Sequence, residues 1–142
     1  MSTIIHERPG VYSSYDASSV VRGGGAAKVI GIAALASKGA TDSVTLLTSY
    51  DGAVAAFGED TAGTNMAALT RLLFLNGATA VKAVRAASAS DYDDAFDLLA
   101  MEDDIQAVVC GSGELTVRQL LRTSLESASA ARRERIGVIG SE

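Results

Sequence analysis

The sequence predicts an α/β fold, a layered mixed sheet with flanking helices that is preceded by an extended amino-terminal arm. Three observations predict it. Short apolar runs rich in β-branched residues recur along the 142 residues, as in strands buried on both faces. Segments with apolar residues at helical spacing separate these runs. Strand-like and helix-like segments alternate in order, which is typical of a sheet layered with helices.

Five segments of the body are expected to be strands. The run AKVIGIAALA is the most apolar and should lie inside the sheet. The run SVTLLT is either a strand or the approach to a helix. The last strand is either a sheet edge or part of a longer design, because no helix follows it. In chain order the five segments are residues 27–36, 43–48, 78–87, 105–111 and 136–140.

Four helices are expected between these strands. Ser49 can cap a short helix that stops at Gly58. Ser90 opens a helix with Asp93 at the capping-box distance. The strongest helix spans residues 116–133, with Arg132 and Arg133 in its last turn, where positive charge is favourable. Its inner face is expected to carry Val117, Leu120, Leu121, Leu125 and Ala128.

The fourth predicted helix spans residues 62–76 and ends at Gly77. Its apolar residues define one broad face. Met66, Leu69 and Leu73 form the central stripe, and Leu72 and Leu75 widen it.

Composition excludes several classes of function. The net charge of −5 argues against nucleic-acid binding, which needs a basic surface. A single cysteine excludes an intrachain disulfide and a cysteine-based metal site, and it indicates a reducing compartment. No signal-peptide pattern and no apolar run of the length that spans a membrane is present. We therefore expect no cofactor, no metal and no membrane partner.

Two candidate enzyme sites are better explained as structural features. GGGAAK suggests a phosphate loop, but Lys28 is followed by a strand rather than by Ser or Thr and a helix. The Cys110–Ser112 turn follows a buried strand, which is where α/β enzymes bind ligands. A nucleophilic Ser or Cys there would need a base, but the only histidine is His6, in the arm. No G-x-S-x-G motif surrounds Ser112 either. Cys110 is therefore expected to be a small buried hydrophobe. A small α/β enzyme or nucleotide-binding domain using the Cys110–Ser112 loop remains the alternative function.

An acidic group does not have the spacing of a calcium loop. It is expected to be a solvated face or a docking patch, which could meet an arginine group between copies of the chain. The acidic residues are Asp91, Asp93, Asp94, Asp97, Glu102, Asp103 and Asp104, and the arginines are Arg118, Arg122, Arg132, Arg133 and Arg135.

The sequence of residues 4–22 predicts an extended arm. Pro9 lacks an amide donor and suits an added or edge strand. The arm is too rich in Tyr, Val and Ile for a typical disordered tail. Strand addition to another molecule is the favoured interpretation, ahead of folding back and disorder. The anchoring side chains are Ile4, Ile5, Val11, Tyr12, Tyr15, Val20 and Val21, and the hinge is Gly23, Gly24 and Gly25.

Several of these stretches, taken in order, resemble the amino-terminal part of contractile tail sheath proteins. These occur in bacteriophages with contractile tails (myoviruses), in defective prophages and in R-type bacteriocins. The matching stretches are ERPGVYSSYDASS, KVIGIAALASKG, LLTSYDGAVAAFGED, MAALTRLLFLNGATAVKAVRA and DIQAVVCGSGELTVRQLLRTSLESASAARRERIGVIG. Members of that family are much longer than 142 residues.

The resemblance implies a structural protein without enzymatic activity, located in a virion tail that is assembled in the host cytoplasm. It implies that residues 1–25 form an arm and a hinge, and that residues 26–142 form the first portion of a longer sheath core. The implied partners are further copies of the subunit in a helical sleeve, the tail tube protein, and baseplate and tail terminator proteins. Contraction would drive the tube through the host envelope. A generic small interaction domain, flavodoxin-like without cofactor, is a third possibility.

Overall fold

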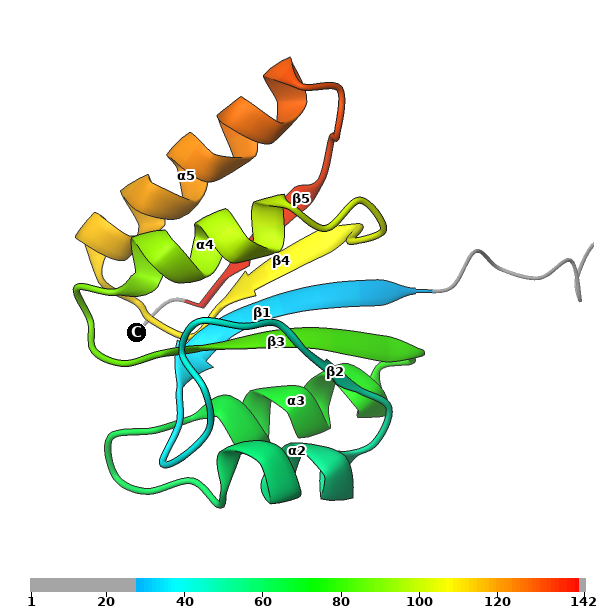
Figure 1. Ribbon diagram of the computed structural model, residues 1–142, viewed down its shortest axis with the longest axis vertical. Coiled ribbons are helices and arrows are strands. Elements are labelled where there is room, and N and C mark those ends of the chain that lie inside the picture. Colours follow the sequence, from blue (N-terminus) through cyan, green and yellow to red (C-terminus); the bar gives the residue numbers. More distant parts are fainter. Residues whose placement is uncertain (1–27, 141–142) are drawn as a thin grey trace, which may run out of the picture.

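The computed structural model describes residues 28–140, and these residues confirm the α/β class. A five-stranded mixed sheet lies between α2 and α3 on one face and α4 and α5 on the other (Figure 1). The elements are β1 (Val29–Leu35), β2 (Thr45–Leu47), α2 (Tyr50–Phe57), α3 (Met66–Leu75), β3 (Ala80–Ala86), α4 (Tyr92–Ala100), β4 (Ala107–Cys110), α5 (Leu115–Ala130) and β5 (Ile136–Ile139).

The sheet has the strand order β2-β3-β1-β4-β5. β1 lies in the centre and pairs in parallel with β3 and β4, as its continuous apolar sequence predicts. β5 pairs in parallel with β4, and β2 pairs antiparallel with β3. Among the described residues, β5 therefore lies at an edge of the sheet.

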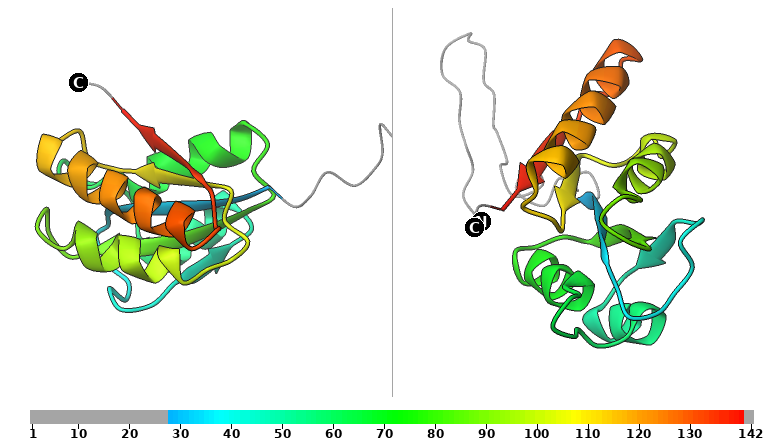
Figure 2. Two further views of the ribbon diagram at one scale, coloured as in Figure 1. Left: turned by 90° about the horizontal axis from the view of Figure 1, so that it is seen from above. Right: turned by 90° about the vertical axis from the view of Figure 1, so that its left-hand side faces the viewer.

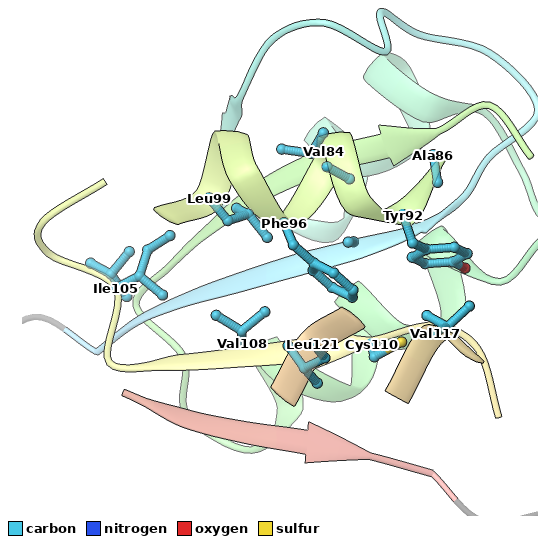
Figure 3. Close-up of a cluster of buried hydrophobic side chains, with 13 residues drawn as sticks. Val84, Ala86, Tyr92, Phe96, Leu99, Ile105, Val108, Cys110, Val117 and Leu121 are labelled. Atoms are coloured by element: carbon cyan, nitrogen blue, oxygen red, sulfur yellow. The ribbon is translucent and has the colours of Figure 1, made fainter. Parts of the chain in front are cut away.

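Two apolar clusters lie on opposite faces of the sheet. The cluster under α4 and α5 contains Phe96, Leu99 and Val108 (Figure 3), and the other, under α2 and α3, contains Ile32 and Phe57. The side chains of β3 alternate between the two faces, because Val81 and Ala83 belong to one cluster and Val84 to the other. The inner face predicted for α5 is confirmed: Val117, Leu121 and Ala128 are buried.

The caps of α2 are as predicted. Ser49 Oγ accepts a hydrogen bond from the Gly52 amide at 3.1 Å. Gly58 ends the helix with a φ of 78°, in the left-handed region that glycine adopts without steric cost.

The prediction for α3 was wrong at its start and on one part of its face. Residues 62–65 form a loop, and the helix begins at Met66, because the Asp60 carboxylate reaches forward to the first-turn amides. Asp60 Oδ1 accepts from the Ala67 amide at 3.0 Å, and Oδ2 accepts from the Ala68 amide at 2.7 Å. Leu72 and Leu75 do not widen the buried face, since they are 54% and 71% exposed.

Two further helix ends differ from the prediction. Ser90 does not cap α4, because its hydroxyl bonds to that of Ser88 and the helix begins two residues later, at Tyr92. Arg132 and Arg133 lie beyond α5 rather than in its last turn. Arg132 has a φ of 61°, and the Arg133 amide donates to the Ala128 carbonyl at 2.8 Å, so a left-handed turn ends the helix.

Candidate assembly surface

β5 lies at the edge of the sheet in both views of Figure 2, and its large side chains are apolar and exposed. Ile136 is 70% exposed, Val138 47% and Ile139 48%. Edge strands of proteins that remain monomeric are typically protected by charges, proline or bulges. β5 has the sequence IGVI and contains no charge and no proline. It therefore has the composition of a strand that pairs with another chain.

The backbone of β5 offers hydrogen-bonding groups on its outer side. The Ile136 amide donates inward to the Gln106 carbonyl at 3.1 Å. Since successive residues of a strand direct these groups to opposite sides, the amides of Gly137 and Ile139 face the free edge. A strand arriving there would find unpaired donors and acceptors, each worth about 1 kcal/mol net when paired.

One face of β5 packs against α5 and leaves an apolar groove beside it. A Cβ on Gly137 would lie 2.5 Å from Leu125 Cδ1, so the absence of a side chain lets α5 lie against the strand. The groove has a volume of about 320 Å³ and is lined by Leu121, Leu125 and Ile139 with arginines at its rim. Arg118 at that rim donates to the Gly140 carbonyl at 3.0 Å and so fixes the end of β5.

No helix covers the other face of β5 (Figures 1 and 2), whereas Val109 of β4 on this face is buried in the cluster under α2 and α3. Ile136 and Val138 face this side, next to Ala107 and Val109 in the register of the sheet. A cavity of about 400 Å³ separates these strands from Leu69 of α3. Thus, within residues 28–140, β5 is open along its edge and on one face. We name β5 together with these two concave regions the β5 rim.

The opposite edge of the sheet is a weaker candidate. β2 has only three residues and pairs antiparallel with β3. Its exposed large side chain is Leu46, at 60%. A short edge strand of this kind is one way in which proteins limit unwanted pairing.

Comparison with solved structures finds a similar fold. The chain superposes on the helical sheath of the anti-feeding prophage in its contracted state with a TM-score of 0.59 and 17% sequence identity. The match covers 95% of this chain and 39% of the sheath chain.

The chain has the fold found in a contractile sheath subunit. It spans well under half of the length of that subunit. No protein-family model matches the sequence, and no curated protein matches it either. At this identity the similarity establishes the fold, and the role of the chain is addressed below as a proposal.

The Cys110–Ser112 turn is held by hydrogen bonds between the Cys110 thiol and the backbone of Ser112. Cys110 is 5% exposed, as predicted for a small buried hydrophobe, and burial raises the pKa of its thiol. Ser112 Oγ accepts a hydrogen bond from the Glu114 amide at 3.2 Å, and within residues 28–140 it makes no contact with a general base. Lys28 directly precedes β1, as the sequence predicts, so it does not begin a helix as a phosphate-loop lysine would.

The acidic group divides into separate local interactions. The Lys82 ammonium donates hydrogen bonds to the carboxylates of Asp104 and Glu102. Both bonds raise the pKa of Lys82, and the bond to Asp104 has the larger effect. Asp103 lies 3.1 Å from Arg133, so part of the two oppositely charged groups pairs within one chain. Among the described residues, no set of acidic, histidine and cysteine side chains could hold a metal ion. No helix in the same range is long and apolar enough to cross a bilayer.

The predicted arm and hinge lie outside the described residues. This applies to the seven arm anchors and to the hinge glycines, Gly23, Gly24 and Gly25. Sequence reasoning missed the open face of β5. The signal was present in IGVI, where Gly137 separates two large side chains that share a face.

Proposed function

We propose that the chain is a structural subunit of a contractile tail sheath, which polymerises with copies of itself into a helical sleeve around an inner tube. The sheath-like fold carries this proposal. The β5 rim supports it independently, because exposed Ile136, Val138 and Ile139 add nothing to the core of the described domain. An apolar patch of this kind is typical of a protein interface.

Subunits join by strand addition in this proposal. Residues 4–22 of one copy supply an extended strand, and β5 of a neighbour accepts it along its free edge. Apolar side chains of the arm, such as Val11 and Tyr12, enter the groove beside Leu121 and Leu125. Gly23–Gly25 gives each subunit freedom to reorient while the strand stays paired.

Assembly into a helical sleeve would also determine the other partners of the subunit and how the sleeve contracts. The inner face would contact a tail tube protein, and the ends would contact baseplate and tail terminator proteins. Contraction would be a change from a metastable extended packing to a tighter one, with the free energy held in subunit interfaces. The site of action would be a virion tail, assembled in the bacterial cytoplasm.

Two variants test the proposal. Removal of residues 1–22 should leave the circular dichroism spectrum of the body intact and abolish polymers in negative-stain images. Val138→Lys should have the same effect at the acceptor side, because it places a charge on the apolar rim. Leu46→Lys, on the opposite edge, is the matched control and should polymerise normally. Normal polymers from either of the first two variants would contradict the proposed strand addition.

A further inference from the structure

A second concave site lies at the carboxyl ends of β1 and β4. The chain leaves β1 toward α2 and α3 on one face, whereas it leaves β4 toward α5 on the other face (Figure 1). Where neighbouring strands diverge in this way, the loops above them separate and open a crevice, which is the usual ligand position in open α/β sheets. Here the crevice has a volume of about 250 Å³. Its walls include Leu35, residues 62–65, Ala89 and Gly111.

Tyr92 presents an unpaired hydroxyl to this crevice. The side chain is 1% exposed, and its ring packs against Phe96 with centroids 5.9 Å apart. Its oxygen lies at the end of the ring away from Phe96 (Figure 3). The backbone amide of Leu35 lies close enough to the hydroxyl oxygen to act against the rise in its pKa, but within residues 28–140 no group accepts the hydroxyl proton in hydrogen-bond geometry. A buried donor without an acceptor is costly, so the geometry favours an acceptor in the crevice.

The other polar groups at the crevice are mainly acceptors. Asn65 donates through Nδ2 to the Gly111 carbonyl at 2.7 Å, and this bond leaves its Oδ1 without a donor among the described residues. Glu114 also lines the crevice; burial is the main cause that raises the pKa of Tyr92, and the Glu114 carboxylate adds a smaller contribution. A ligand here must therefore accept one hydrogen bond and donate another.

Charge excludes an anion as the preferred ligand. Glu114 lies at the crevice, and Asp91, Asp93 and Asp94 lie at the start of the adjoining α4. These carboxylates oppose the attraction that the amino-terminal ends of α4 and α5 would exert on a phosphate. A neutral group avoids the conflict.

We propose that the crevice between the ends of β1 and β4 binds an amide group. The amide oxygen accepts the Tyr92 hydroxyl proton, and the amide N–H donates to Glu114 or to Asn65 Oδ1. The crevice volume limits the ligand to a small amide or to one amide-bearing residue of a second copy of the chain. The two sources share the same chemistry and are separated by the experiment.

The experiment records the backbone-amide NMR spectrum of the full chain during titration with acetamide. Dose-dependent shifts are expected at Asn65, Gly111 and Ser112, and Tyr92→Phe should weaken binding at least tenfold. Tyr50→Phe, which alters a half-exposed tyrosine on α2, is the matched control and should bind acetamide as the parent does. If a second copy supplies the amide, the same resonances will also shift on raising the protein concentration, except in Tyr92→Phe.

Stability and a competing ligand complete the test. Because the hydroxyl proton has no acceptor among the described residues, Tyr92→Phe should keep or raise the thermal midpoint. A lowered midpoint would overturn the proposal by showing that the hydroxyl is already paired, for example to a permanently bound water. The proposal is also overturned if neither acetamide nor protein concentration shifts these resonances, or if inorganic phosphate shifts them in a Tyr92-dependent manner while acetamide does not.

Discussion

The central strand β1 and the edge strand β5 are both apolar, but only one of them is enclosed. β1 has α2 and α3 on one face, α4 on the other, and strands on both sides; Ile32, Ala33 and Ala34 are fully buried. β5 has one strand neighbour and one helix, and three of its four residues are exposed. The same residue types therefore stabilise the fold in β1 and remain available for binding in β5.

This difference separates folding from assembly within one sheet. Burial of a side chain of this size in the core contributes roughly 1.5–3 kcal/mol. The exposed side chains of β5 contribute little of this to the described domain, and the proposed strand addition would account for their apolar character. Substitutions in the two strands should accordingly change different measurements.

The largest expected effect is on the central strand. Ile32→Ala removes a fully buried side chain and should lower the free energy of unfolding by about 2–5 kcal/mol. Ile136→Ala, the matched change on β5, should alter it by less than about 0.5 kcal/mol. Urea denaturation of both variants measures the contrast, and equal losses would remove the distinction between core and rim.

A smaller effect is expected where β5 meets α5. Gly137→Ala places a Cβ against Leu125 and should cost about 1–3 kcal/mol, because the helix must move away from the strand. Gly140→Ala, next to the same strand, meets nothing within 4 Å and serves as the control. Chemical denaturation should show a reduced midpoint for Gly137→Ala alone; an unchanged midpoint would mean that α5 does not fix the rim.

The sequence predicts much of the enclosed region because its signals are local. The apolar run of β1, the Ser49 cap and the Gly58 stop depend on neighbouring residues and were all confirmed. The start of α3 was mispredicted because its cap comes from Asp60, outside the usual capping position. The open face of β5 and the unpaired Tyr92 hydroxyl depend on strand order and on loops distant in sequence, which periodicity does not encode.

The next prediction concerns α3, whose first-turn amides donate to the Asp60 carboxylate. Asp60→Ala should cost about 1 kcal/mol, since two first-turn amides lose their acceptor. Glu59→Ala is the control, because the side chain of Glu59 makes no hydrogen bond or ion pair among the described residues. A thermal melt followed by circular dichroism compares the two variants, and identical midpoints would show that the carboxylate does not stabilise the start of α3.

The smallest expected effect is confined to alkaline solution. Burial raises the pKa of Tyr92 to about 12 from its ordinary value of 10.0. Between these values the folded chain retains a proton that the unfolded chain releases, so stability falls as the pH rises through this window. Lys82, whose pKa is also raised, acts in the same direction. Tyr92→Phe should therefore lose less stability than the parent above pH 10, in urea denaturation at stepped pH; parallel losses would contradict the assignment.

The most direct test of the assembly role is hydrogen exchange at the outer amides of β5. The rates for Gly137 and Ile139 should be compared in dispersed chain and in assembled material, with the inward-facing Ile136 amide as the internal reference. Strand addition predicts fast exchange of both outer amides in the dispersed chain and strong protection on assembly. Assembled material in which both amides still exchange at the dispersed rate would contradict the account.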